Sequence, residues 1–339
     1  MSELRTIIRQ PLTELIPLAV PFLIRIDPSN LCNFKCEFCP TGDTELLKSV
    51  GRPKGIMDFE LFRRIIDEIS SFPTKLKKLY FYKDGEPLIN KKLPEMIAYA
   101  TSKQVAEEYW ITTNGSLLNP EMNNKLINAG LNLIRISIEA VTSEGYEKIA
   151  KVKIDYEKLK ENIAHLYSHR KDCRIHIKIV DYSLSEDEKQ KFYQDYESIS
   201  TSIHIDSLMG WSMSEAKDFK LGTNSLESPD GQQLIRKEVC PFPFYTLTIN
   251  FDGTVSVCCV DWSHSTVVGD LRENSLMSIW KGAKLQEFRK MHLEKRRFEN
   301  RACGNCDYLN TLQDNLDNDA ESILKKILLG NHIETFDGE

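Results

Sequence analysis

Between residues 22 and 211, short apolar runs alternate with amphipathic stretches, and this alternation restricts the possible folds more than any other feature of the sequence. Six apolar runs predict strands, at residues 22–26, 79–82, 109–113, 133–138, 174–180 and 202–208. The amphipathic stretches predict helices, at residues 59–69, 93–102, 120–129, 156–169 and 186–198. Six consecutive strand–helix units predict an α/β fold with a parallel sheet, open or curled into a partial (β/α)6 barrel. In such sheets, functional residues gather at the carboxyl ends of the strands.

The composition of the 339-residue chain excludes several other classes of protein. Hydrophobic residues make up 41% and charged residues 28%, as in ordinary globular proteins, so a disordered or fibrous chain is not expected. A net charge of -6 argues against a dedicated nucleic-acid binder, which usually carries a basic face. The apolar stretch 15–24 is interrupted by prolines, is too short to span a bilayer, and follows no cleavable signal. We therefore expect a cytoplasmic protein with neither a nucleic-acid nor a membrane partner.

Eight of the nine cysteines fall into two groups, which directs attention to metal or iron–sulfur binding. The first group is Cys32, Cys36 and Cys39, and the second is Cys240, Cys258, Cys259, Cys303 and Cys306. An odd number of cysteines without an export signal argues against a disulfide framework. Thiolates are soft ligands that suit zinc and iron. Cys173 stands alone at the amino end of the fifth strand and is expected to be inert.

The first cysteine group follows the first strand as Cys32-Asn-Phe-Lys-Cys36-Glu-Phe-Cys39. Three thiolates in one loop bind three corners of a [4Fe–4S] cube and leave the fourth iron open, as catalysis requires. The alternative is three of the four ligands of a zinc site. This C-x3-C-x2-C spacing resembles the signature of the radical S-adenosylmethionine (SAM) superfamily, and Phe38 matches the aromatic residue that precedes its last cysteine.

Further residues at strand ends strengthen the resemblance. Asp84-Gly85-Glu86-Pro87 ends the second strand, where the family has a Gly-Gly-Glu motif that holds the amino group of the methionine moiety. Asp84 replaces the first glycine, which is a departure from the family pattern. A carboxylate at Glu86 suits an ammonium group. The resemblance implies SAM contacts from Phe38, Gly85, Glu86, Asn114, Ser137, Glu139, Val180 and Met209, with Ser137 and Glu139 at the ribose hydroxyls and Val180 and Met209 beside the adenine.

The C-terminal third of the sequence has a different organisation. Residues 212–239 are rich in Ser, Gly, Asp and Lys and predict a linker. Two alternating runs at 245–251 and 254–258 flank an Asp-Gly turn and predict a β-hairpin. Helices are expected at about 275–295 and 320–329. The expected divisions are a lead-in (1–21), the barrel (22–211), the linker, a small hairpin-plus-helix domain (240–310), and a helix with a polar tail (311–339).

The second cysteine group lies in this small domain. Gly253 before Cys258, the segment Gly269-Asp-Leu followed by 276–280, and the Cys303-x2-Cys306 pair resemble the auxiliary-cluster extensions called SPASM and, in shorter form, twitch. The resemblance implies one auxiliary [4Fe–4S] cluster with four ligands, Cys240, Cys258, Cys303 and Cys306. A structural zinc site is the alternative. Cys259 is expected to be a buried apolar residue, a substitute for Cys258 as ligand, or a hydrogen-atom donor to a substrate radical.

The resemblance implies that SAM is reductively cleaved to methionine and a 5′-deoxyadenosyl radical, which abstracts a hydrogen atom from the substrate. One fully ligated auxiliary cluster suits the acceptance of an electron, so the expected net reaction oxidises a carbinol to a ketone, as in twitch-type dehydrogenases of cyclitols and aminoglycosides. The expected substrate is a small polyol, cyclitol or sugar, and the expected electron donor is a flavodoxin or ferredoxin. Candidate bases are Lys83, Asp84, Asp181, Tyr182, Asp261 and His264.

Three alternatives remain open from the sequence. The first is an enzyme that modifies a peptide by thioether formation, crosslinking or epimerisation. About 21 residues precede the first strand, too few for a leader-peptide-binding domain, and this favours a small polar substrate. The second is a radical epimerase that uses Cys259 as its hydrogen donor. The third is an iron–sulfur or zinc scaffold without catalysis, to which only the departure at Asp84 points.

Overall fold

The computed structural model describes residues 10–208, 210–212, 226 and 233–333. Six parallel strands form its centre in the order expected, each paired with the next along the chain. They are β1 (Leu23–Ile26), β2 (Leu76–Tyr80), β3 (Ala106–Thr113), β4 (Leu133–Ile138), β5 (Arg174–Asp181) and β6 (Ser202–Ser207). The partial α/β barrel predicted from the alternation is therefore confirmed. Strands β2 and β3 begin three residues earlier than predicted, because the charged pairs 77–78 and 107–108 interrupt the apolar pattern there.

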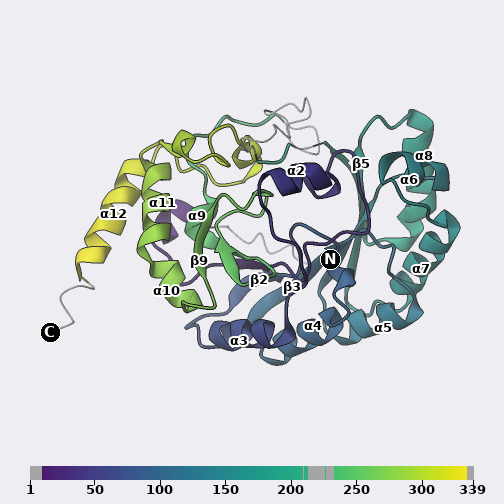
Figure 1. The fold of residues 1–339 in the computed structure, drawn as a ribbon, viewed down its shortest axis with the longest axis horizontal. Helices are drawn as coiled ribbons and strands as arrows, with labels where there is room; N and C mark the ends of the chain where they lie inside the picture. The colour runs from purple at the N-terminus through teal and green to yellow at the C-terminus, as the bar shows by residue number, and fades with distance from the viewer. Residues whose placement is uncertain (1–9, 209, 213–225, 227–232, 334–339) are drawn as a thin grey trace, which may run out of the picture.

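Helices cover the outer, convex face of this sheet and form an arc in Figure 1. They are α3 (Phe59–Ser70), α4 (Leu93–Ser102), α5 (Pro120–Asn128), α6 (Ser143–Ile149), α7 (Tyr156–Ser168) and α8 (Glu186–Tyr196). Polar N-caps begin several of them. Asp58 accepts from the backbone of Glu60 and Leu61, and Ser185 forms a capping box with Glu188. Two short helices, α6 and α2 (Thr44–Ser49), were not predicted, since each has too few residues to show a helical period.

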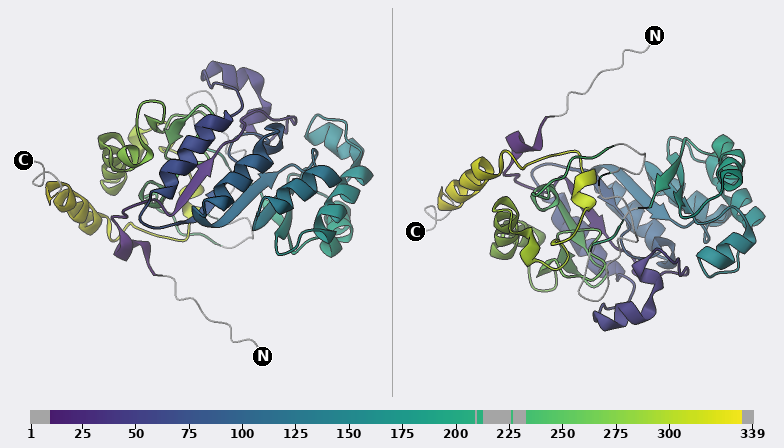
Figure 2. Two further views of the ribbon diagram at one scale, coloured as in Figure 1. Left: turned by 90° about the horizontal axis from the view of Figure 1, so that it is seen from below. Right: turned by 90° about the horizontal axis from the view of Figure 1, so that it is seen from above.

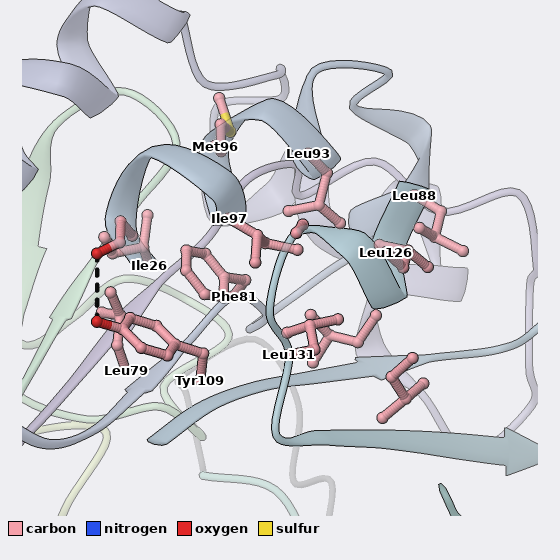
Figure 3. Packing of buried hydrophobic residues seen from close by; sticks show 14 of the residues in the cluster. Ile26, Leu79, Phe81, Leu88, Leu93, Met96, Ile97, Tyr109, Leu126 and Leu131 are labelled. Atoms are coloured by element: carbon pink, nitrogen blue, oxygen red, sulfur yellow. Dashed lines mark hydrogen bonds between the residues drawn. The ribbon is translucent and has the colours of Figure 1, made fainter. Parts of the chain in front are cut away.

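The core fills the space between the sheet and the outer helices. Strand β4 shows how the sequence achieves this, because Ile134, Ile136 and Ile138 are each at most 1% exposed and alternate with more polar residues. Figure 3 shows the same packing around Leu79, Phe81 and Ile97, which come from β2, the residue just after it, and α4. One face of each strand is therefore apolar and covered by helices, and the opposite, concave face carries polar side chains.

The C-terminal segment extends the same sheet rather than forming a separate one. The strands β7 (Thr246–Ile249), β8 (Thr254–Ser256) and β9 (Val267–Asp270) complete a nine-stranded sheet in the order β6-β5-β4-β3-β2-β1-β7-β8-β9. The predicted hairpin is present as β7 and β8, in shorter form. Its first strand also pairs in parallel with β1, where Ile24 lies opposite Leu247. This pairing joins two segments more than 200 residues apart and was not predicted.

The remaining helices lie beside the hairpin, at the end of the molecule opposite β6 (Figures 1 and 2). The helix predicted at 275–295 is in fact two helices, α10 (Leu276–Lys281) and α11 (Ala283–Leu293). They are separated by Gly282, whose extended backbone begins α11. The last helix, α12 (Ala320–Ile333), packs with α1 (Leu12–Leu15) in a small second core. Among the residues described, no helix combines the length and apolar character needed to cross a bilayer.

Candidate active site

A cavity of about 370 Å³ lies at the carboxyl ends of the parallel strands, and its walls are formed by residues of β1, β3, β4, β5 and β6 and by the loop after β2. The cysteine loop after β1 and residues of the C-terminal segment also line it. Most of the predicted site residues line this cavity: Cys32, Cys36, Phe38, Cys39, Lys83, Asp84, Gly85, Glu86, Asn114, Ser137, Glu139, Val180 and Cys259. Met209 lies outside the described residues. Motifs that follow one another in the sequence therefore line one cavity in the structure.

The cysteine loop is held in place by contacts at both of its sides. The backbone N–H of Lys35 donates to the carbonyl of Ala150, just after α6, at 2.9 Å. The ring of Phe34, 3% exposed, meets that of Tyr146 edge to face at 5.8 Å. Burial raises the pKa of the Cys32 thiol to about 12, so a thiolate at this depth needs a cationic partner such as iron. Three such thiols in one loop, facing one cavity, fit a [4Fe–4S] cluster with an open iron.

Glu86 is the best-positioned carboxylate for an ammonium group. Its Oε1 accepts from Leu88 N at 3.0 Å and Thr113 Oγ1 at 2.7 Å, and its Oε2 accepts from Asn114 N at 2.7 Å. Burial raises the pKa of Glu86 to about 7, although these three donors act in the opposite direction. The carboxylate is therefore fixed in orientation while one lone pair of Oε2 remains for a ligand.

Gly85 matches the family motif for a steric reason. An ideal Cβ at this position would lie 2.3 Å from the carbonyl oxygen of Leu31 and 2.4 Å from that of Ser29. The strand-end loop after β2 therefore passes directly against the backbone that leads into the cysteine loop, and only glycine allows this approach. The Glu86 N–H donates to the same Leu31 carbonyl at 2.8 Å. This contact ties the predicted SAM-binding loop to the predicted cluster loop.

Asp84, the departure from the family motif, is the centre of a buried charge network. Its Oδ2 lies 2.8 Å from Lys83 Nζ and 2.9 Å from His264 Nε2, and its Oδ1 lies 3.7 Å from Arg52. Burial alone favours the neutral carboxyl, but the charges of Lys83 and Arg52 outweigh it and hold the pKa of Asp84 below its usual range. Lys83 also donates to Asn250 Oδ1 at 3.0 Å. An aspartate held ionised in this way links the β2 loop to the C-terminal segment and is a weak proton acceptor.

The other three candidate bases are not brought to the cavity. Asp181 pairs with Lys189 at 2.9 Å on the outside of β5. The ring of Tyr182 packs against Phe38 at 5.4 Å, so it supports the cavity wall from behind. Asp261 is fully buried and accepts from the backbone and hydroxyl of Thr266 at 2.7 and 2.8 Å. Each of these carboxylates or phenols has a structural contact that accounts for its position.

At the end of β4, Ser137 and Glu139 face the cavity on the same side of the strand, as predicted for contacts to a diol. The backbone N–H of Glu139 lies 3.3 Å from Tyr146 Oη. Burial raises the pKa of Glu139 to about 7. Across the cavity, Asn114 Nδ2 donates to Asn33 Oδ1 at 3.0 Å, which connects the end of β3 to the cysteine loop. A nucleoside placed here would meet donors and acceptors from three strands.

The second cysteine group surrounds a small separate cavity of about 30 Å³. Cys240, Cys258, Cys303 and Cys306 all line it, whereas the neighbouring Cys259 lines the large cavity. Burial raises the pKa of Cys240 to about 12. In the part of the chain that the structure describes, no three His, Cys, Asp or Glu side chains converge closely enough for one metal ion. Four thiols around one cavity match the four protein ligands that a four-iron cube requires.

Comparison with known families agrees with both cysteine sites. Residues 26–189 match the model of the radical SAM superfamily, and residues 240–307 match the SPASM model, described as an iron–sulfur cluster-binding domain. The chain belongs to the radical SAM superfamily. It is accordingly an enzyme that uses SAM with a [4Fe–4S] cluster, and its SPASM region carries auxiliary iron–sulfur chemistry.

Curated relatives of this radical SAM enzyme match only in part. A tungsten-containing aldehyde ferredoxin oxidoreductase cofactor-modifying protein from Pyrococcus furiosus is 31% identical over 34% of this chain and 30% of its own length. A GTP 3′,8-cyclase from Staphylococcus carnosus is 25% identical over 57% of each chain. The chain thus spans between about a third and three fifths of these relatives, and their activities are not transferred to it.

Solved structures with the same fold cover more of the chain. They include anSMEcpe with bound AdoMet, with a TM-score of 0.60 and 16% identity over 93% of this chain and 99% of the other. BtrN in complex with AdoMet and 2-DOIA has a TM-score of 0.54 and 18% identity, and the match covers 85% of this chain and 93% of the other. SuiB from Streptococcus suis bound to SAM has a TM-score of 0.59 and 13% identity, and the match covers 88% of this chain and 73% of the other. At these identities the similarity shows the fold of the radical SAM enzyme and leaves its substrate open.

Two residues beside the auxiliary cavity were not singled out from the sequence. His292 on α11 is 1% exposed and lines the cavity with the four cysteines. The Cys240 N–H donates to its Nδ1 at 3.4 Å, which leaves the proton on Nε2, and Nε2 has no partner among the described residues. Arg297 donates to the carbonyls of Gly304 and Cys306 at 3.2 and 3.1 Å and braces the C-x2-C loop. Nothing in the local sequence distinguishes either residue.

Several polar residues on the concave face of the radical SAM barrel were also missed. Arg25, Arg135, Lys178 and Asp206 line the large cavity from β1, β4, β5 and β6. The sequence does contain a signal for three of them, because each alternates with buried isoleucines, as in Arg135-Ile-Ser-Ile and His176-Ile-Lys-Ile. Alternation within a strand whose other face is covered by helices predicts a polar interior.

Proposed function

We propose that this enzyme dehydrogenates a carbinol of a small polar substrate, with an auxiliary [4Fe–4S] cluster as the electron acceptor. The observation that carries the proposal is the position of the Cys258-Cys259 dipeptide. Cys258 lines the auxiliary cavity and Cys259 lines the cavity that also contains Cys32, Cys36 and Cys39. The two cavities therefore meet at adjacent residues of one chain segment, which suits transfer of an electron from a substrate in the large cavity to the auxiliary cluster.

Each part of the cavity has a defined role in this proposal. When bound, SAM and the first cluster supply a 5′-deoxyadenosyl radical that takes a hydrogen atom from the substrate. Cys32, Cys36 and Cys39 would hold that cluster, and Cys240, Cys258, Cys303 and Cys306 would hold the auxiliary one. Glu86 would pair with the SAM ammonium, and Ser137 and Glu139 would bind the ribose hydroxyls. The cavity walls would limit the access of water to the reacting atoms.

The proton of the carbinol needs an acceptor within the cavity. Asp84 is engaged by two cations, and Glu86 and Glu139 are assigned to SAM, so Asp206 is the remaining carboxylate among the described residues that line the cavity. Its Oδ2 accepts from Lys178 Nζ at 2.8 Å. The other oxygen, Oδ1, is the atom to which we assign the proton.

Iron analysis of matched variants tests the cluster assignment. The wild type, reconstituted without oxygen, should hold ~8 iron atoms per chain, and the Cys32→Ala/Cys36→Ala/Cys39→Ala variant should hold ~4, as two four-iron cubes require. A second variant, Cys303→Ala/Cys306→Ala, should still cleave SAM under strong reductant but should not release an oxidised product. About 4 iron atoms in the wild type and none in the triple variant would contradict the electron-accepting role.

The position of Cys259 supports one other function, radical epimerisation. Its side chain lines the large cavity, where a thiol can return a hydrogen atom to a substrate radical. For an epimerase, Cys259→Ala should abolish product formation while 5′-deoxyadenosine still forms. For the dehydrogenase, the same variant should still form the oxidised product, which has two hydrogen atoms fewer than the substrate. Mass spectrometry of the product distinguishes the two, since an epimer keeps the mass of the substrate.

A further inference from the structure

The inner part of the large cavity contains two arginines without an acidic partner. Arg25 on β1 and Arg135 on β4 both line it. Arg135 lies two residues before Ser137 and four before Glu139 on the same strand, so it is deeper in the barrel than the predicted SAM contacts. Within the described chain, neither arginine forms an ion pair, and Arg25 Nη1 and Arg135 Nε are buried without a hydrogen-bond partner. Buried donors of this kind are rarely left unsatisfied unless a ligand completes them.

Other charged groups on the cavity do not compensate these two cations. Lys178 and Asp206 pair with each other at 2.8 Å. Lys83 and Asp84 do the same, also at 2.8 Å. The two remaining carboxylates, Glu86 and Glu139, face the positions proposed for the SAM ammonium and ribose. The inner cavity therefore has two cations that no lining carboxylate pairs with, and an anion held beside them away from bulk water is attracted more strongly than at the surface.

Both guanidinium groups lie over aromatic rings. Arg25 lies over the ring of Tyr80 at 4.7 Å, and Arg135 lies 5.8 Å from the ring of Trp110. The Tyr80 and Trp110 rings are themselves in edge contact at 5.5 Å. Contacts to ring faces stabilise the cations without using their N–H groups. Arg25 Nη1 and Arg135 Nε are thus available to an added acceptor, and guanidinium groups match the two oxygens of a carboxylate or phosphate.

We propose that the substrate carries an anionic group, a carboxylate or a phosphate, which Arg25 and Arg135 bind in the inner part of the cavity. This inference rests on the function proposed above and narrows its substrate class. Acidic or phosphorylated sugars and cyclitols fit the site, and aminoglycosides do not, because their ammonium groups would face two unpaired cations. Thr112, whose buried hydroxyl also has no partner, lies opposite Arg135 on β3 and adds a donor to the same region.

Anion binding to the reconstituted, SAM-bound enzyme tests the inference without knowledge of the substrate. Isothermal titration calorimetry with inorganic phosphate, malonate and neutral glycerol should show binding of at least one anion and none of glycerol. The stronger of the two anions distinguishes phosphate from carboxylate as the preferred group. Arg135→Gln and Arg25→Gln should each weaken binding by about tenfold or more. The inference would be overturned if neither anion binds to the wild type, or if both variants bind the anion as tightly as the wild type does.

Arg63 provides a control within the same barrel. It is exposed on α3, its guanidinium pairs with Glu60 at 3.2 Å, and it does not line the cavity. Arg63→Gln should bind the anions as the wild type does, and a parallel loss in this variant would point to a general electrostatic effect and overturn the inference. Should a glutamine variant not fold, Arg135→Lys keeps the charge but loses the planar edge, and it should still weaken binding.

The same samples separate a failure of this inference from a failure of the proposed function. Iron content and 5′-deoxyadenosine formation by the wild type report on the clusters and SAM, independently of any anion. If the protein holds two clusters but binds no anion, the inference of an anionic substrate would fall and the dehydrogenase proposal would stand. If the protein holds only one cluster but binds anions through Arg25 and Arg135, the anionic substrate would stand and the dehydrogenase proposal would fall.

Discussion

At the scale of single residues, the charge state of Glu86 is expected to control the affinity of the proposed site for SAM. The carboxylate is 2% exposed and receives three hydrogen bonds from the β2 and β3 ends. These donors fix its position, and burial makes its charge costly until an ammonium group arrives. The same burial that makes Glu86 selective for a cation also makes SAM binding sensitive to pH.

Replacement of Glu86 by glutamine tests this role. Glu86→Gln keeps the shape of the side chain but removes the charge, so SAM should bind about 10- to 100-fold more weakly, as expected for loss of a hydrogen bond to a charged group. Equilibrium dialysis with labelled SAM measures the change. Glu121→Gln, on the exposed face of α5, should bind like the wild type. Unchanged affinity in Glu86→Gln would show that another group holds the ammonium.

The pH dependence of SAM binding follows from the raised pKa of Glu86, which is about 7 before SAM binds. Only the ionised carboxylate attracts the ammonium, so below pH 7 a proton must first be released and the apparent affinity should fall by about tenfold per pH unit. Above pH 8 the affinity should be constant. Titrations from pH 5.5 to pH 8.5 measure the slope, which should be smaller in Glu86→Gln. Any slope left in that variant belongs to Glu139, whose pKa burial also raises to about 7.

At the scale of elements, the Asp84 network joins the loop after β2 to the segment between β8 and β9. Lys83 and Asp84 belong to the first and His264 to the second, and Lys83 also contacts Asn250 in the turn between β7 and β8. The departure from the family glycine therefore has a structural explanation, because a carboxylate here attaches the barrel to the C-terminal segment. It gives no support to the alternative that the chain is a scaffold without catalysis.

Asp84→Asn should destabilise the protein strongly. It removes the charge that pairs with the buried cations Lys83 and Arg52 and leaves Asp27 as the carboxylate near them. Loss of one partner from a buried network costs about 3–5 kcal/mol, or roughly 5 °C or more in melting temperature. Differential scanning fluorimetry of the reconstituted enzyme measures the shift. Glu45→Gln, which removes an exposed pair with Lys48 on α2, should leave the melting temperature unchanged. Equal melting temperatures for both variants would show that the network contributes little.

At the scale of the whole molecule, β1 is an interior strand because the C-terminal segment covers its free side. It pairs with β2 on one side and with β7 on the other. Ile24 and Ile26 on this strand are fully buried. Without β7, the strand that leads into the cysteine loop would be an exposed apolar edge, which is prone to aggregation. The C-terminal segment thus serves the stability of the barrel as well as the auxiliary cluster.

A chain that ends at residue 239 tests this dependence. It contains all six parallel strands but lacks β7, and we expect most of it to be insoluble when the full chain is soluble under the same conditions. The soluble fraction and light scattering of the two proteins measure the difference. A soluble, monomeric short chain that still binds about 4 iron atoms through Cys32, Cys36 and Cys39 would show instead that the barrel folds independently.

Much of the barrel and of the first cluster site could be predicted from the sequence, because the signals are local. The alternation of apolar runs and amphipathic stretches predicted six parallel strands, and the C-x3-C-x2-C spacing with Gly85 and Glu86 predicted the SAM-binding side of the cavity. Strand periods and loop spacings depend on residues only a few positions apart. The family comparison confirms the superfamily, and the individual residue roles remain proposals that the variants above test.

Contacts between distant segments were decided only by the tertiary structure. The pairing of β1 with β7, the burial of Asp84 among Lys83, Arg52 and His264, and the position of His292 beside the four cysteines have no local sequence signal. The sequence by itself determined which faces of the strands are apolar, since that depends on a two-residue period. Which distant cations and carboxylates meet across the barrel depends on its curvature and on the closing hairpin. For this reason the unpaired state of Arg25 and Arg135 is visible only in the folded chain.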